Sequence, residues 1–132
     1  MALKISLKPG DRLFVGGAAI ANGRHHCELT ILNNVQVLRE REIMREEEAD
    51  SPCKRLYLII QLMYMDPESL PRYHELFVAH AKDIVTAASS LRSHIAAIGE
   101  SVARGEYYQA LKQARGLLAE ETLILDAARQ PG

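Results

Sequence analysis

Cysteine, net charge and long hydrophobic runs are all scarce in this 132-residue sequence, and each scarcity excludes a class of protein. Two cysteines, Cys27 and Cys53, fit neither a disulfide framework nor a zinc site and are expected to be free thiols. A formal net charge of −1 gives no field over the whole chain that would attract nucleic acid or an anionic membrane. Residues 56–65, the longest apolar stretch, are too few to span a bilayer, and the N-terminal apolar run is too short for a signal peptide. These absences predict a cytoplasmic protein that is not inserted in a membrane.

Motifs that carry catalysis or hold a metal are also missing. The sequence contains no nucleophile elbow, phosphate-binding loop, zinc-ligand spacing or HExxH motif. Gly16-Gly17 lies between two expected strands and predicts a hairpin turn, not a phosphate site. His25 and His26 fall in an expected strand, where neighbouring side chains point to opposite faces and cannot chelate one ion. The sequence therefore predicts neither enzyme activity nor a bound metal or cofactor.

Residues 1–49 have the pattern of a small β module. Leu3, Ile5 and Leu7 alternate with polar residues, which is typical of a half-buried strand. Turn signals follow at short intervals, and Asn22-Gly23 is the strongest hairpin signal among them. The other turn signals are Pro9-Gly10-Asp11, Gly16-Gly17 and Asn33-Asn34. This spacing predicts about five short strands in an antiparallel sheet or partial barrel, which needs a helix or a partner chain to cover it.

Residues 50–132 have the pattern of a helical module of about three helices. Asp50-Ser51-Pro52 predicts a helix start, because a polar side chain caps the first turn and proline is tolerated there. The helix that follows is apolar on almost every side, which predicts a central helix packed on the sheet and on the later helices. Together the modules predict an α+β fold, with the β module packed on a helical bundle.

A long helix is predicted over residues 72–103. Along it, apolar residues from Phe77 to Val102 recur at alternating steps of four and three, which is a heptad seam. A last helix over residues 106–128 carries a weaker apolar stripe that Glu121 interrupts, and the two helices predict a long antiparallel hairpin. The sequence leaves open whether the seam faces the same chain or another one. Four seam residues form the candidate protein interface: Phe77, Ile84, Leu91 and Ile98.

The stretch Val35–Ile43, VQVLREREI, begins as an alternating strand and ends in a run of alternating charge. On a strand, Arg39 and Arg41 share one face, and Glu40 and Glu42 share the other. Two guanidinium groups on one sheet edge can bind phosphates bidentately or stack on bases, which makes them candidate nucleic-acid contacts. The alternative is that all four charges form ordinary ion pairs with neighbouring strands, and composition alone favours this alternative.

Three segments of the chain resemble the FlbT family of flagellin regulators. They are LKPGDRLFVGGAAIANG at 7–23, ELTILNNVQVLREREIM at 28–44 and EEADSPCKRLYLIIQLM at 47–63. The resemblance extends over the whole chain and is closest in the β module and the first helix. It implies a post-transcriptional regulator, in most cases a repressor, that binds the 5′ untranslated region of flagellin mRNA. It also implies that the chain works alongside the protein FlaF.

The β module is also similar to the carbon storage regulator CsrA, a small RNA-binding dimer. Residues 3–16, LKISLKPGDRLFVG, resemble its first hairpin, and VQVLREREI resembles its last strand. By position, this resemblance implies an RNA contact at Arg39 and first-strand contacts at Ile5, Leu7 and Lys8. Leu7 stands where that family has a basic residue, and Arg41 has no counterpart there. The resemblance implies a homodimer, unless the central helix caps the sheet and keeps the chain monomeric.

Two functions are therefore the alternatives. In the first, the chain binds a flagellin mRNA leader through a local patch that consists of Lys4, Ile5, Lys8, Arg39 and Arg41. In the second, it is a flagellar protein-binding adaptor whose heptad seam contacts flagellin or FlaF, with only indirect effects on mRNA. The sequence does not specify whether the chain represses or activates flagellin synthesis.

Overall fold

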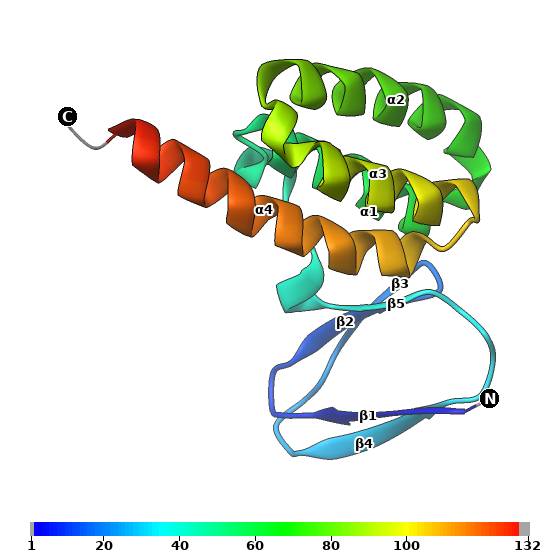
Figure 1. The fold of residues 1–132 in the computed structure, drawn as a ribbon. Coiled ribbons are helices and arrows are strands. Elements are labelled where there is room, and N and C mark those ends of the chain that lie inside the picture. The colour runs from blue at the N-terminus through cyan, green and yellow to red at the C-terminus, as the bar shows by residue number, and fades with distance from the viewer. Residues whose placement is uncertain (1, 130–132) are drawn as a thin grey trace. The chain divides into compact units, whose positions relative to one another are not determined.

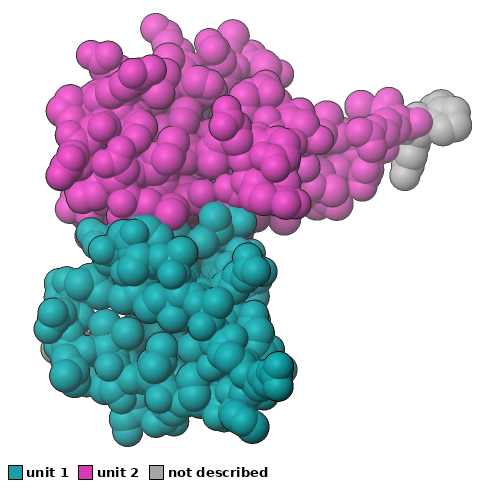
Figure 2. Space-filling model, turned by 180° about the vertical axis from the view of Figure 1, so that it is seen from behind, with its two compact units in different colours: residues 1–43 teal, residues 44–132 magenta. Residues whose placement is uncertain are grey.

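The computed structural model describes residues 2–129 and shows five short strands followed by four helices (Figure 1). The chain forms two compact units, a β unit of residues 1–43 and a helical unit of residues 44–132 (Figure 2). The predicted α+β class is confirmed, with four helices in place of about three. The first unit ends at Ile43, and Met44 bonds to Gln61 of the helical unit. The Gln61 amide accepts the Met44 N–H at 2.8 Å and donates to the Met44 C=O at 3.0 Å.

The β unit contains two small antiparallel sheets. In the first, β1 (Leu3–Leu7) pairs with β4 (Cys27–Ile31). In the second, the strand order is β3-β2-β5, with the bounds Ala18–Ala21, Arg12–Val15 and Val37–Arg39. The core cluster of the unit consists of Ile5, Leu7 and Leu13, with partly buried apolar residues packed against it: Val15, Ile20, Cys27, Leu29, Ile31 and Val37.

The turns of the β unit differ from their sequence signals. Gly16-Gly17 forms the predicted hairpin turn between β2 and β3, and both glycines have positive φ, 52° and 93°, which suits a two-residue hairpin. Asn22-Gly23, the stronger hairpin signal, connects β3 to β4 in the other sheet, so that prediction is wrong. The hairpin implied by the similarity to CsrA is not formed either, because β1 and β2 lie in different sheets.

The Asn22 side chain explains why its segment does not turn back as a hairpin. Its Nδ2 donates to the carbonyl oxygens of Lys8 at 2.8 Å and of His25 at 2.9 Å. Its backbone N–H donates to the carbonyl oxygen of Asp11 at 2.7 Å. An asparagine that bonds to distant backbone groups is not available for a local turn, and here it ties the end of β1 to the segment before β4.

The helical unit consists of α1 (Pro52–Met65), α2 (Leu70–Ala87), α3 (Arg92–Ala103) and α4 (Tyr107–Arg129). Ser51 caps α1 as predicted, with its Oγ accepting the Lys54 N–H at 3.2 Å, and proline occupies the first position. Within the unit, α1 packs against both α2 and α4, and α3 packs mainly against α4 (Figure 1). The described part of the chain also contains four short 3₁₀ turns: η1 (Glu40–Glu42), η2 (Glu46–Glu48), η3 (Pro67–Ser69) and η4 (Ser89–Leu91).

The predicted long helix over residues 72–103 is wrong, because the chain forms two helices there, α2 and α3. The backbone leaves helical geometry at Ala88, with φ −143° and ψ 83°, and then enters η4. Ser89 and Ser90 follow, and serine competes with helix formation through bonds between its side chain and the backbone. The antiparallel hairpin is therefore shorter than predicted and contains only α3 and α4, joined at Gly105 (Figure 1).

The four seam residues proposed as a protein interface are buried in the single chain. Phe77 is 6% exposed, Ile84 and Leu91 are each 3% exposed, and Ile98 is 0% exposed. The break at Ala88 lies between Ile84 and Leu91 and leaves both side chains buried, so the apolar period persists although the helix does not. In the single chain these four side chains therefore belong to the core.

Glu121 does not simply interrupt the apolar stripe of α4. Its buried carboxylate accepts hydrogen bonds from the Ser51 hydroxyl and, at 3.0 Å, from the Cys53 N–H. A carboxylate at a helix N-terminus satisfies backbone donors that the helix itself leaves unpaired. Burial and the neighbouring Glu121 carboxylate raise the pKa of the Cys53 thiol to about 12. Glu121 therefore fastens α4 to the start of α1.

Candidate nucleic-acid interface

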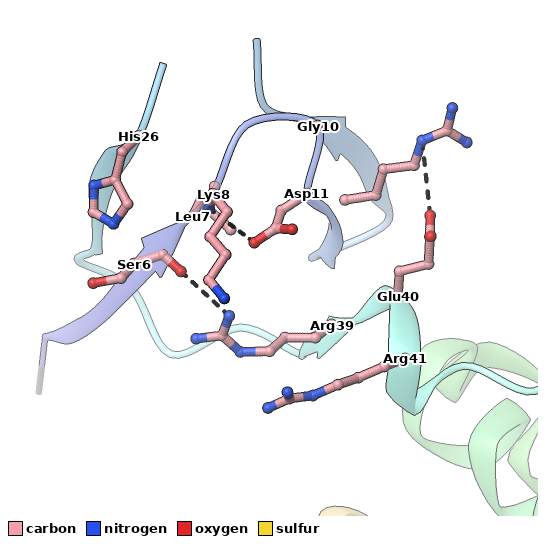
Figure 3. Close-up of a pocket in the computed structure, with 10 residues that line it drawn as sticks. Ser6, Leu7, Lys8, Gly10, Asp11, His26, Arg39, Glu40 and Arg41 are labelled. Carbon is pink, nitrogen blue, oxygen red and sulfur yellow. Dashed lines mark hydrogen bonds and ion pairs between the residues drawn. The ribbon is translucent and has the colours of Figure 1, made fainter. Parts of the chain in front are cut away.

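A pocket of about 350 Å³ opens on the β unit, where β1 ends beside β5 and η1 (Figure 3). Every residue that lines it belongs to this unit, so its shape depends on the two small sheets and the turns between them. The lining residues are Ser6, Leu7, Lys8, Gly10, Asp11, Arg12, His26, Arg39, Glu40 and Arg41. The pocket thus contains Lys8, Arg39 and Arg41 of the RNA-binding patch that the sequence predicts.

Arg39 is positioned by the last strand of the β unit. It ends β5, opposite Leu13 of β2, and its side chain is half-buried. The guanidinium Nη1 donates to the carbonyl oxygen of Ser6 at 3.3 Å, so the group is held across the end of β1 (Figure 3). One nitrogen is engaged in this bond, and the guanidinium has further N–H donors.

Arg41 does not lie on a strand, because β5 ends at Arg39 and Arg41 belongs to η1. The chain turns into η1, because the Glu42 carboxylate accepts the Arg39 N–H at 2.9 Å and the Glu40 C=O accepts the Ile43 N–H at 3.1 Å. Arg41 is exposed. Its side chain nevertheless extends in the same direction as that of Arg39 (Figure 3). The two arginines share one pocket through a tight turn and not through strand alternation.

The carboxylates of the pocket leave three of its cations without an ion pair. Asp11 accepts the Lys8 backbone N–H at 2.9 Å, and Glu40 pairs with Arg12 at 3.7 Å. Within residues 2–129, no carboxylate forms an ion pair with the side chain of Lys8, Arg39 or Arg41. The interpretation of REREI as a set of ordinary cross-strand ion pairs therefore fails at both arginines. A local positive charge remains in a chain of net charge −1.

The other residues of the predicted patch are placed differently. Lys8 is exposed and lines the pocket, whereas Lys4 is exposed on the same face of β1 as Ser6 but is not a lining residue. Ile5, for which an RNA contact is predicted, is 4% exposed and belongs to the core cluster, so its side chain is not presented at the surface. Strand alternation explains the difference, since it turns the side chain of Ile5 inward and those of Lys4 and Ser6 outward.

His26 lines the pocket and was missed by reasoning from the sequence. It lies in the segment before β4, not in a strand as predicted, and its side chain is exposed. The register of the first sheet, in which Leu7 faces Cys27, places His26 across from Lys8 (Figure 3). No local sequence pattern indicates this position, because it follows from the pairing of β1 with β4.

The arrangement is suited to binding an anion. The pocket offers guanidinium, ammonium and imidazole groups as donors to an anion. Across residues 2–129, no group of three His, Cys, Asp or Glu side chains comes together in a way that could hold a metal ion. No described helix is long and apolar enough to cross a membrane.

The chain matches the family described as flagellar protein FlbT over residues 3–125. It is 43% identical to the probable flagellum biosynthesis repressor protein FlbT 1 of Bradyrhizobium diazoefficiens, over 92% of this chain and 83% of that protein. It is 33% identical to the probable flagellum biosynthesis repressor protein FlbT of Rhodopseudomonas palustris, over 95% of this chain and 98% of that protein.

The flagellum biosynthesis repressor protein FlbT of Caulobacter vibrioides is 31% identical, over 92% of this chain and 87% of that protein. No solved structure matches the chain. These names describe regulators of flagellum biosynthesis, not enzymes.

Proposed function

We propose that this chain, which belongs to the FlbT family of flagellar proteins, represses flagellum biosynthesis after transcription by binding the 5′ untranslated region of flagellin mRNA. Its relatives are named as repressors of flagellum biosynthesis. The observation that carries the RNA-binding step is the convergence of Lys8, Arg39 and Arg41 in one pocket without carboxylate partners among the described residues.

The chemistry of these three side chains favours an RNA ligand. Guanidinium groups bind phosphate oxygens bidentately and also stack on bases, and an ammonium group adds a point charge for a neighbouring phosphate. Single-stranded leader RNA exposes its bases and its phosphates at once, and proteins bind such strands with basic grooves. Because the whole chain is almost neutral, binding depends on this pocket and on the salt concentration.

A mobility-shift assay with a flagellin leader RNA tests the proposal. We expect retention of the RNA, with log K falling against log salt at a slope of about −2, the value for about three phosphate contacts on a single strand. Arg39→Gln and Arg41→Gln should each weaken binding by about tenfold, because each removes a charged hydrogen-bond donor. Arg24→Gln removes the same charge from an exposed position of the β unit outside the pocket and is the matched control.

Two results would contradict this assignment. If the Arg24→Gln variant loses as much affinity as the Arg39→Gln variant, binding depends on net charge and not on the pocket. If wild-type protein never retains leader RNA at low salt, with or without FlaF, the RNA-binding step itself is wrong.

A protein-binding function is the second candidate, and one observation favours it. All residues from Thr122 to Arg129 are exposed, including the large apolar side chains of Leu123, Ile124 and Leu125. In Figure 1 this end of α4 projects past the other helices of its unit. Because the heptad seam is buried, an adaptor for FlaF or flagellin would use this end of α4 instead.

Pull-down of FlaF and of flagellin by the purified chain separates the two candidates. If the adaptor function is correct, Leu123→Ser with Leu125→Ser should abolish capture, while Val78→Ser, at an exposed apolar position of α2, should not. Capture of either protein by a chain that never shifts leader RNA would select the adaptor.

A further inference from the structure

The pocket of the β unit is concave, and its size restricts what can enter it. Its volume of about 350 Å³ lies at the lower end of the range of small-ligand sites, roughly 300–1,000 Å³. A space of this size suits a ligand about as small as one nucleotide. Duplex RNA presents its phosphates on a convex surface, where they would reach the rim of such a pocket and leave its interior empty.

Two different chemistries meet across the pocket. The cationic wall comes from Arg39 at the end of β5 and from Arg41 in η1. The segment before β4 contributes His26, whose exposed imidazole ring the register of the first sheet places beside Lys8 (Figure 3). A nucleotide has the same division, with a charged phosphate at one end and a flat aromatic base at the other.

We infer that this pocket takes one unpaired nucleotide of the leader RNA, with its phosphate bound by Arg39 and Arg41 and its base stacked on His26. The inference rests on the proposed RNA-binding function and adds that the protein selects an unpaired, unstacked position. An imidazole is one of the planar side chains on which splayed-out bases stack, and stacking tolerates any base because every base has a π face. A base inside a duplex cannot reach such a wall unless it leaves the stack.

The chain supplies a matched pair of residues for the test. His25 and His26 are neighbours and both are exposed, but only His26 lines the pocket. The His25 backbone carbonyl bonds to Asn22, and that bond survives truncation of the His25 side chain. His25→Ala therefore controls for loss of an exposed imidazole at the same turn of the chain.

The experiment is competition against labelled flagellin leader RNA by two octamers, oligouridylate and an abasic octamer with the same ribose-phosphate backbone. Wild type and His25→Ala should prefer oligouridylate by about tenfold, a factor within the range expected for stacking on one aromatic side chain. His26→Ala should bind the two octamers equally. His26→Phe should retain the preference, because phenylalanine keeps a stacking face and loses only the ring nitrogens.

The outcomes separate failure of the proposed RNA binding from failure of the stacking on His26. If wild type does not retain the leader RNA, the proposed function fails and the inference fails with it. If the leader is retained but His26→Ala still prefers oligouridylate, only the inference fails. Loss of the preference in both His26→Phe and His26→Ala overturns stacking on this side chain.

Discussion

The β unit and the helical unit differ in how much apolar surface holds each of them together. Among the described residues, the β unit buries four apolar side chains, those of Ile5, Leu7, Leu13 and Leu38. The helical unit buries large apolar side chains from each of its four helices. Small sheets need such a core because a few strands alone are marginally stable in water. The unit that carries the candidate site is therefore the one with the smaller margin of stability.

The two units also differ in how a glutamate carboxylate is used, buried in one unit and exposed in the other. Glu121 of the helical unit is 8% exposed and accepts hydrogen bonds from Ser51 and Cys53. Glu40 of the β unit has a side chain that is 66% exposed and faces Arg12 at 3.7 Å on the rim of the pocket. A buried, hydrogen-bonded carboxylate contributes to stability, whereas an exposed ion pair contributes little. We therefore expect Glu121 to affect the stability of the fold and Glu40 to affect the electrostatic attraction of an anion to the pocket.

The largest effects are expected from removing a core leucine from each unit in turn. Leu13→Ala takes away one of the four buried apolar side chains described in the β unit, so this unit should lose its fold and RNA binding should be abolished while the helical circular dichroism persists. Leu117→Ala leaves a cavity in the helical unit and should lower its free energy of unfolding by about 2–5 kcal/mol. At low temperature this second variant should still bind RNA.

Circular dichroism melting and RNA titration of both variants check this pair of expectations. The expected difference in stability between the units is contradicted if Leu13→Ala and Leu117→Ala lower the helical melting temperature equally and leave RNA binding equally intact. That result would mean that the chain unfolds as one cooperative body.

A smaller effect is expected from Glu121→Ala. The substitution removes a cap from α1 and leaves the buried Cys53 N–H without its acceptor, which should cost about 2 kcal/mol of stability. RNA affinity should not change. Glu120→Ala removes the neighbouring carboxylate of the same helix and is the control, for which no loss of this size is expected. Equal denaturation midpoints for the two variants would contradict the capping role.

Local patterns in the sequence placed most strands and the start of α1 correctly, but not the strand pairing or the break between α2 and α3. Alternation and turn chemistry are read over a few residues, so the strands and the capped start of α1 could be predicted. Pairing of β1 with β4 is a non-local property, and Asn22 decides it through bonds to the backbone of Lys8 and Asp11. The break at Ala88 could not be predicted because the local pattern continues across it. Ile84 and Leu91 preserve the heptad period on both sides of the break.

The candidate site could be predicted only in part. Arg39, Arg41 and Lys8 line one pocket, although the strand geometry invoked for Arg41 is wrong. Ile5 could have been excluded from its own alternation, which places it on the apolar face with Leu7. His26 could not have been found, because it joins the pocket only through the register of β1 with β4.

The smallest effect, and the one of opposite sign, is expected from Glu40→Gln. Its ion pair with Arg12 is exposed, so its loss should change the free energy of unfolding by less than about 1 kcal/mol. RNA affinity should rise by about fivefold, because a negative charge leaves the pocket and the guanidinium of Arg12 becomes available to a phosphate. The salt dependence should steepen by about 0.7, which corresponds to one added contact with a single strand.

Glu75→Gln separates a local effect from a general one. Glu75 is exposed on α2, so its substitution changes the net charge equally but leaves the pocket untouched. If both variants gain the same RNA affinity in a mobility-shift titration, the net charge of the whole chain governs binding and the charges of the pocket have no special effect. A gain confined to Glu40→Gln would show that an exposed carboxylate with almost no influence on folding sets the strength of RNA binding. Glu121→Ala should show the reverse, a large effect on folding and none on binding.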